Sequence, residues 1–472
     1  MILRGGVLLF LLLAVILTGI YFLRDSQKEE PTLEEIVESK LNAYQTDLVD
    51  SMDSFKTNRD VAQYLLAWGK NKGISCSIDS HDNVTFTLKA SDSTWKSRKP
   101  VVFLCEYNVK SLAADPEPIA AALTIAKNTK QHGKVKLIFS PSDGIGSSGV
   151  SALSASSFTS RTEVFCLGKS AFSKISLETG GYLKFRLSDK LHYQSTSYDK
   201  AYRVRISGLP AEKISAYMGS GVNPIKQLGS VLANFKSTSL LFELASFRGG
   251  NSADTAPDGA VMTIVISSAD EAKFISKMDK ALDRFYDKYA EQYPEASYTY
   301  EEVELPKRVL ATEDAENIVS LLYTAFNGTY YKDDDGNVIA LTNIGSISTK
   351  NQRLRVQVSA LSCAQEYLDE MTEAYRTIAG LCDIKFSVKT SLPLYHGGTA
   401  ALRTSFEEAF YAYSGDSKMK TDPTVEFTPC GLLTALNDQM PILYCSVTDK
   451  TKEKLAGAFI TYLSTNSEDV SQ

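Results

Sequence analysis

The chain has 472 residues, 43% of them hydrophobic and 22% charged. This length exceeds one ordinary hydrophobic core and predicts two or three domains, and the composition is that of a globular protein rather than a disordered one. Lys and Arg number 50 against 56 Asp and Glu, which gives a net charge of −6. Because no basic cluster stands out in the sequence, we expect no nucleic-acid partner.

An uncharged run, GGVLLFLLLAVILTGIYFL, occupies residues 5–23. About 19 residues at a rise of 1.5 Å nearly match the ~30 Å hydrocarbon core of a bilayer. A cleaved signal peptide is the alternative, but its apolar region is shorter and ends at a small-residue cleavage site. We therefore predict a transmembrane anchor over residues 1–24 and a polar tether over 25–32. The expected location is the cell membrane, single-pass, with the bulk of the chain outside the cytoplasm.

Apolar runs and amphipathic helices alternate through the first part of the chain. Two helices with apolar positions three and four apart are predicted within 33–52 and 58–73, and a strand, turn and strand within 74–90. The runs that follow are PVVFLCEY, IAAALTIAKNT, KVKLIFSPS, GVSALSASSF and TEVFCLG. Such near-continuous hydrophobicity is typical of a partly parallel sheet that is covered on both faces.

The pattern changes near residue 200, where alternating strands are paired with amphipathic helices in two successive units. This pattern predicts an antiparallel sheet with helices on one face. The last ninety or so residues return to the earlier style, which indicates a discontinuous domain with an insertion. We predict an α/β peptidase-like domain formed by residues 33–195 and 387–472, with an inserted α+β lid over 196–386.

Four stretches occur in an order that matches a known family: LAADPEPIAAALTIA, FRGGNSADTAP, LTNIGSISTKNQRLRVQVSAL and TPCGLLTAL. The first resembles a metal-bridging segment, the next two resemble a lid, and the last resembles a final metal-ligand turn. Together they resemble the zinc-dependent dipeptidase, aminoacylase and carboxypeptidase superfamily, most closely its Xaa-His dipeptidase branch, over roughly residues 33–470. The resemblance implies a catalytic sheet domain, an inserted lid and peptide-like substrates.

In that family two zinc ions share a bridging Asp and take further carboxylate and histidine ligands. In this sequence the corresponding positions are Cys105 and Tyr107 for the first His-x-Asp motif, Asp115 for the bridging Asp, Asp143 and Gly144 for the paired glutamates, Gly168 for the next Asp and Pro429 for the last His. Only Asp115 is retained as a ligand and only Cys105 offers a new one. The resemblance therefore implies a degenerate metal centre, in which Cys105, Asp115 and Asp143 are vestigial.

The lid positions that reach the substrate in relatives also differ. The family's histidine falls near Glu212 and Lys213, its Asn falls near Asp254, and its carboxylate-binding Arg falls near Leu361. The former cleft is expected near Tyr107 and Asp254.

Two chemical alternatives remain open. One metal held by Cys105 and Asp115, with Asp143 as base, would have fewer protein ligands than the usual three of a catalytic zinc. A cysteine nucleophile at Cys105 would need a nearby histidine, and none falls in a mapped segment. Asp115 also suits a helix cap before Glu117.

The favoured function is a membrane-anchored, non-catalytic homologue that binds a peptide or protein through the former cleft or the lid and needs no cofactor. The alternative is a dipeptidase or amidohydrolase with an altered centre that holds one zinc ion.

Overall fold

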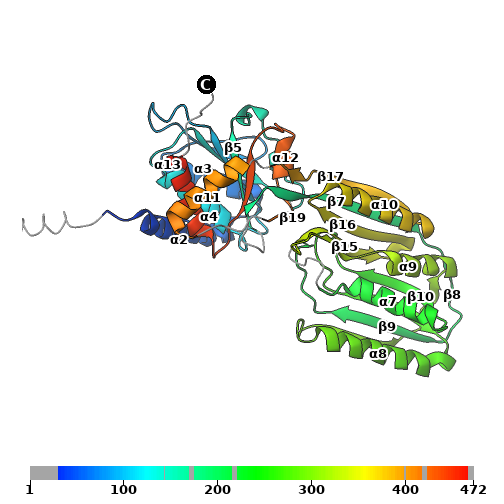
Figure 1. Cartoon of the computed structure of the whole chain (residues 1–472). Helices are drawn as coiled ribbons and strands as arrows, with labels where there is room; N and C mark the ends of the chain where they lie inside the picture. The colour runs from blue at the N-terminus through cyan, green and yellow to red at the C-terminus, as the bar shows by residue number, and fades with distance from the viewer. Residues whose placement is uncertain are drawn as a thin grey trace, which may run out of the picture.

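The computed structural model describes residues 30–142, 144–169, 175–214, 221–397, 400–416 and 422–465. The predicted anchor and Asp143 lie outside these ranges. Within them, no helix combines the length and the apolar character needed to cross a bilayer. The described residues form two domains, one built on a mixed sheet and one on an antiparallel sheet (Figure 1).

The first domain contains a seven-stranded sheet in the order β1-β2-β4-β3-β5-β20-β6. Its four central strands β4, β3, β5 and β20 are parallel, their neighbours β2 and β6 are antiparallel to them, and β1 pairs antiparallel with β2. The strands are β1 (Ser75–Ile78), β2 (Val84–Leu88), β3 (Val101–Tyr107), β4 (Val135–Pro141), β5 (Glu163–Gly168), β6 (Ile175–Ser176) and β20 (Ile442–Ser446). In β3, the apolar residues 101–104 are all buried, and so is Cys105. Such a run is expected for a strand that is covered on both sides.

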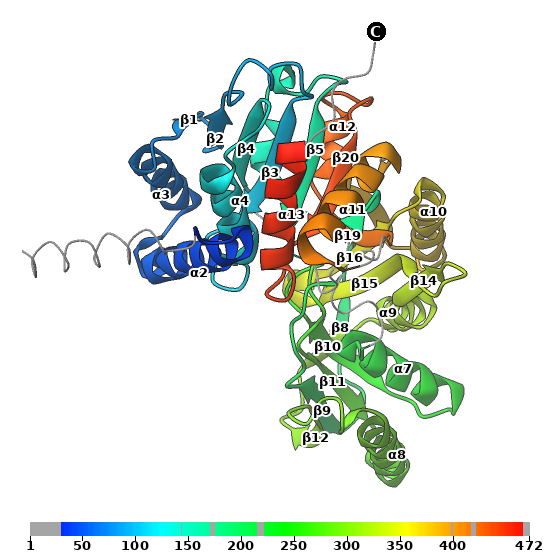
Figure 2. The ribbon, with the colours of Figure 1, turned by 60° about the vertical axis from the view of Figure 1, so that its left-hand side comes forward.

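Helices cover both faces of this sheet (Figure 2). The larger layer packs α2 (Leu33–Ser51), α4 (Glu117–Asn128), α11 (Ala400–Ser414) and α13 (Lys452–Thr465) against one face. The short helices α5 (Ser148–Ser151) and α12 (Cys430–Thr434) pack on the other face, and α3 (Asn58–Asn71) contacts β1 and β2. Because α11, β20 and α13 come from the end of the chain, the domain is completed only after the insertion.

The second domain, the lid, is built on a sheet whose main path is β12-β9-β11-β10-β15-β16-β7-β17, with neighbours antiparallel. Helices α7 (Pro224–Ser237), α8 (Glu271–Tyr289), α9 (Thr312–Thr324) and α10 (Gln365–Leu381) cover one face (Figure 1). The strands are β7 (Glu178–Lys190), β9 (Lys200–Ser207), β10 (Glu243–Gly249), β11 (Ala260–Ile266), β12 (Ser297–Val303), β15 (Val338–Ser348), β16 (Arg353–Ser362) and β17 (Lys385–Leu392). Strand β14 (Gly328–Lys332) pairs with β15, and β8 (Tyr193–Ser195) pairs with β13 (Arg308–Leu310).

Strand β7 joins the two domains. Its first residues pair with β18 (Tyr395–His396) and β19 (Thr424–Phe427), while the rest pairs with β16 and β17 in the lid. The sequence pattern predicts that the lid starts at residue 196. The lid sheet begins earlier than this, within β7. Gly180 is required at the crossing, because a Cβ there would lie 2.0 Å from the Val425 carbonyl oxygen. The predicted mixed α/β sheet domain and the α+β insertion are both present in the described residues.

Candidate functional site

A cavity of about 450 Å³ lies at the carboxyl ends of β3, β4, β5 and β20, between the sheet domain and the lid. This is the usual ligand position in an open α/β sheet. It brings together most of the positions that the sequence assigns to the former site: Tyr107, Asp115, Gly144, Gly168, Lys213, Asp254, Leu361 and Pro429. We call this cavity the cleft.

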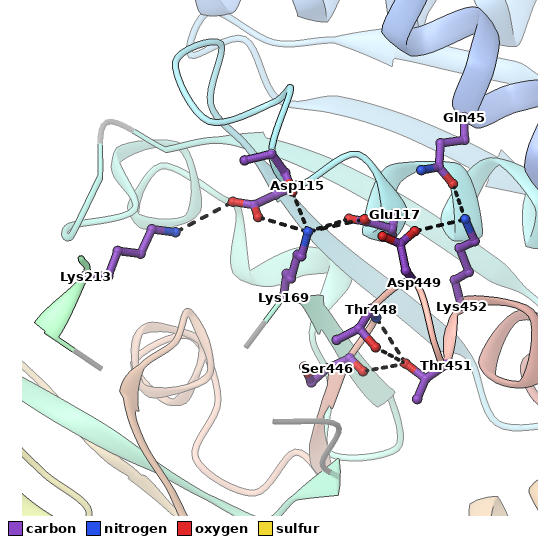
Figure 3. Close-up of polar contacts among 11 residues, drawn as sticks. Gln45, Asp115, Glu117, Lys169, Lys213, Ser446, Thr448, Asp449, Thr451 and Lys452 are labelled. Carbon is purple, nitrogen blue, oxygen red and sulfur yellow. Dashed lines mark hydrogen bonds and ion pairs between the residues drawn. The ribbon is translucent and has the colours of Figure 1, made fainter. Parts of the chain in front are cut away.

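Asp115 is held by two lysine ammonium groups (Figure 3). Lys169 Nζ lies 3.5 Å from Asp115 Oδ1, and Lys213 Nζ lies 3.6 Å from Oδ2. The predicted helix cap is wrong: α4 has Pro116 at its N-cap and no side-chain capping bond, because the Asp115 carboxylate turns toward the lysines. Both oxygens of the retained metal-ligand position therefore already face a cation.

Lys169 also reaches Glu117, a carboxylate that is 2% exposed. Its Nζ lies 3.2 Å from Glu117 Oε2 and donates to the Ala114 carbonyl oxygen. Burial by itself would lower the pKa of Lys169, but hydrogen bonds and Coulombic attraction from Glu117 and Asp115 outweigh it and raise that pKa. Lys169 is thus a permanently charged cation between two carboxylates at physiological pH.

Neither side chain at the first motif is available as a metal ligand. Cys105 is 1% exposed and packs in the core beneath the α2 and α4 layer, where burial raises the pKa of its thiol. Tyr107 donates its hydroxyl proton to the Asp82 carbonyl oxygen at 2.7 Å. A neutral, buried thiol is neither a good ligand nor a nucleophile.

The other positions that the resemblance maps to metal ligands, Gly144, Gly168 and Pro429, offer no side-chain ligand atom. Gly144 has φ +106°, in the left-handed region that glycine favours. A Cβ at Gly168 would lie 2.5 Å from the Tyr444 hydroxyl oxygen. Pro429, at the N-cap of α12, offers no donor atom. Tyr444 therefore occupies the space that a ligand from position 168 would need.

Glu106 lies in the floor of the cleft, and motif mapping assigned it no role. Its Oε1 atom is buried and has no hydrogen-bond partner within the described ranges. Burial raises the pKa of this carboxyl to about 7, although a hydrogen bond with Ser147 lowers it in part. A buried carboxyl with an unused oxygen is suited to a ligand that donates a hydrogen bond or carries a positive charge.

On the lid side, Asp254 is engaged with neighbours in its own domain. The Tyr182 hydroxyl donates to Asp254 Oδ1, and Lys184 Nζ lies 3.7 Å from Oδ2. Leu361 contributes an apolar wall. The lid thus closes the cleft with one neutralised acid, one lysine and an apolar surface.

The donor set does not fit a pair of zinc ions. In the part of the chain that the structure describes, no three His, Cys, Asp or Glu side chains form a group that could hold a metal. Two lysines at Asp115 would repel a divalent cation. Lys169 could have been suspected from the sequence, since it directly follows the expected ligand position 168, but its reach to Asp115 depends on the pairing of β3 with β5.

Comparison with solved structures gives a match to aminoacylhistidine dipeptidase from Vibrio alginolyticus with a TM-score of 0.70. The match covers 91% of this chain and 97% of that one, at 16% identity. The chain therefore shares the fold of this dipeptidase. The predicted resemblance is confirmed at this level.

Other structures align over similar lengths but with lower scores. They include the dipeptidase Dug1p from Saccharomyces cerevisiae, with 11% identity, coverage of 92% and 98%, and a TM-score of 0.48. Aminopeptidase PepT from Bacillus cereus has 10% identity, coverage of 90% and 98%, and a TM-score of 0.46. No protein-family model matches the chain, and no curated protein sequence does.

Proposed function

We propose that the chain is a membrane-anchored, non-catalytic homologue of zinc dipeptidases that binds a peptide or protein segment in the cleft. The observation that carries this proposal is the pair of ammonium groups on Asp115, with Nζ distances of 3.5 and 3.6 Å. A lysine cation supplies charge balance, but it has no open coordination position for water or a carbonyl oxygen. The site keeps a recognition cavity and lacks the electrophile of a metallopeptidase.

The cleft provides features that suit a peptide. Its walls include the apolar residues Leu112, Ile145 and Leu361, and Glu106 offers an unused buried oxygen. A cavity that combines apolar walls with placed polar groups is typical of ligand sites. Glu106 is suited to a peptide amino group or amide N–H, since either can donate to a carboxyl oxygen.

A hydrolase with one metal ion is the second candidate, and the fold similarity to aminoacylhistidine dipeptidase favours it. Elemental analysis of protein purified without chelator separates the two candidates when it is combined with hydrolysis of a Xaa-His dipeptide panel in added zinc, manganese or cobalt. We expect less than one metal per chain. We also expect no dipeptide hydrolysis that depends on Asp115, as judged by comparison with Asp115→Asn. Stoichiometric metal that is lost in Asp115→Asn would support the hydrolase.

Binding is tested by thermal shift of the full chain with dipeptides and longer peptides. Glu106→Gln should weaken the stabilisation by ligand, because it removes the acidic acceptor, while the exposed control Asp283→Asn on α8 should leave it unchanged. If the peptides stabilised both variants equally, Glu106 would not be part of the binding site. Carbonate extraction of membranes tests the anchor, since release of the full-length protein would contradict it.

A further inference from the structure

The face of the lid sheet opposite its helices carries a regular row of basic side chains. One line of paired residues crosses seven neighbouring strands from β9 to β17. In order, the residues on this line are Arg205, Val261, Arg248, Ser348, Arg355, Ser188 and Lys385. Four exposed cations, Arg205, Arg248, Arg355 and Lys385, therefore stand on every second strand. We call these four residues the basic row.

The position of the row follows from strand alternation. Val204 and Ile206, on either side of Arg205, point into the core under the helices, as do Leu354 and Val356 around Arg355. Their basic neighbours must point to the other face. Since α7, α8, α9 and α10 all lie on the core side, no described helix of the lid covers the row (Figure 1).

The row is not neutralised by the described part of the molecule. None of its four side chains forms an ion pair with a described carboxylate, whereas Arg203 on the same face pairs with Glu301 at 3.1 Å. Part of the row lines a groove of about 870 Å³, together with Arg203, Lys350 and a glycine-rich margin at Gly249, Gly250 and Gly259. Asp258 is the one acidic residue among its described lining residues.

We propose that this groove and the basic row bind an extended, acidic peptide segment, at a surface distinct from the cleft. Charge complementarity is the first reason, because four cations that pair with no described carboxylate, on one face of a chain with net charge −6, attract acidic groups. Spacing is the second. Alternate strands lie about 9.6 Å apart, and a polyproline II peptide advances about 9.3 Å in three residues.

Other polyanions fit less well. No aromatic side chain occurs among the described residues that line the groove, so nucleic-acid bases would have no stacking platform. A bilayer surface contacts protruding groups, whereas Arg205 and Arg248 line a hollow. An extended peptide can lie in the groove across the strands and place a carboxylate opposite each guanidinium, a bidentate geometry that arginine favours.

The test measures fluorescence anisotropy of a labelled peptide of repeated Glu-Ser-Pro triplets with the full-length protein. The triple variant Arg205→Gln, Arg248→Gln, Arg355→Gln should bind at least about tenfold more weakly, since the loss of 1.4 kcal/mol corresponds to tenfold. The control removes three exposed charges from the helix side of the lid, Lys280→Gln, Arg284→Gln and Lys288→Gln, and should stay within about twofold.

Several outcomes would overturn the proposal. If the triple variant bound the peptide as tightly as wild type, or if the control lost as much affinity as the triple variant, the basic row would be excluded as the binding site. A matched Gln-Ser-Pro peptide that binds wild type as well as the glutamate peptide would exclude charge recognition, even if the triple variant failed to fold. Tighter binding of polyphosphate, single-stranded RNA or phosphatidylserine vesicles through the same arginines would assign another ligand. A change in oligomeric state in the triple variant would make a second copy the occupant.

Discussion

Lys213 of the lid and Asp115 of the sheet domain form an ion pair across the cleft, with 3.6 Å between Nζ and Oδ2. A small apolar cluster also links the domains, because Tyr182 and Leu361 of the lid pack with Val425 of β19. The same carboxylate is therefore shared between a lysine from each domain (Figure 3). The two lysines differ in burial, and this difference predicts different effects on stability.

Lys169→Met should be strongly destabilising, by about 3 kcal/mol, because it leaves the buried Glu117 without its cation. Lys213→Met should change the free energy of unfolding by less than about 1 kcal/mol, since the Lys213 side chain is 70% exposed. Urea denaturation of both variants at neutral pH measures the difference. Similar losses in the two variants would contradict the assignment of Lys169 as the structural cation.

Glu106 predicts a specific pH dependence. Its pKa is raised to about 7 from the ordinary value of 4.5, so the native state holds more protons than the unfolded state between these pH values. The stabilisation linked to this proton is complete below about pH 4.5 and is lost as pH rises through 7, on the order of 3 kcal/mol in all. Glu106→Gln should remove this part of the pH profile.

Unfolding midpoints measured from pH 4.5 to 8 for wild type, Glu106→Gln and the exposed control Glu304→Gln check the prediction. The Glu106→Gln variant should gain stability relative to wild type toward pH 8. Parallel profiles for wild type and Glu106→Gln would show that the carboxyl titrates as it does in solvent.

Adding a side chain at position 168 should not create a ligand position without further change. Gly168→Ala should cost about 1 to 3 kcal/mol, because its Cβ would overlap Tyr444. The double variant with Tyr444→Leu should cost less than the sum of the two single changes. Gly380→Ala, at a helical position with no atom within 4 Å of the added Cβ, is the control and should be neutral or stabilising. Additive losses would argue against the overlap.

The lid should be removable at a junction that the structure defines. A Cβ on Gly181 would lie 2.9 Å from the Leu394 backbone nitrogen, so the segments that enter and leave the lid pass close to each other there. Joining Gly181 to Pro393 through two glycines should leave a sheet domain that unfolds cooperatively by circular dichroism. A junction from 195 to 387 should aggregate, because it leaves most of β7 without its β16 partner. Cooperative unfolding of both would show that β7 needs no lid partner.

Much of the fold could be predicted from local pattern. The apolar runs of β3, β4 and β5 and the alternation in β9 and β16 each fix an element type without tertiary information. The start of the lid could not be placed, since β7 runs through both domains as one strand with one alternating pattern. Strand partners, not the pattern of a strand itself, decide to which sheet its residues belong.

The absence of a side-chain ligand at Gly168 and Pro429 can be read from the sequence, but the ion pairs of Lys169 and Lys213 with Asp115 cannot. Lys169 and Asp115 are far apart in sequence, and the parallel pairing of Cys105 with Leu167 brings their strands together. The predicted cap at Asp115 failed for the same reason, because the tertiary ion pairs outweigh a local hydrogen bond. Long-range register is what the sequence alone does not provide.

The close crossing at Gly180 and Gly181 has a consequence for finding related proteins. The Val425 carbonyl oxygen and the Leu394 nitrogen exclude a Cβ at these two positions, whatever the cleft binds. Any chain that forms this crossing to place a similar lid meets the same restriction, whatever residues line its cleft. A Gly-Gly pair at the start of a long alternating strand should therefore trace the family where searches for catalytic motifs fail.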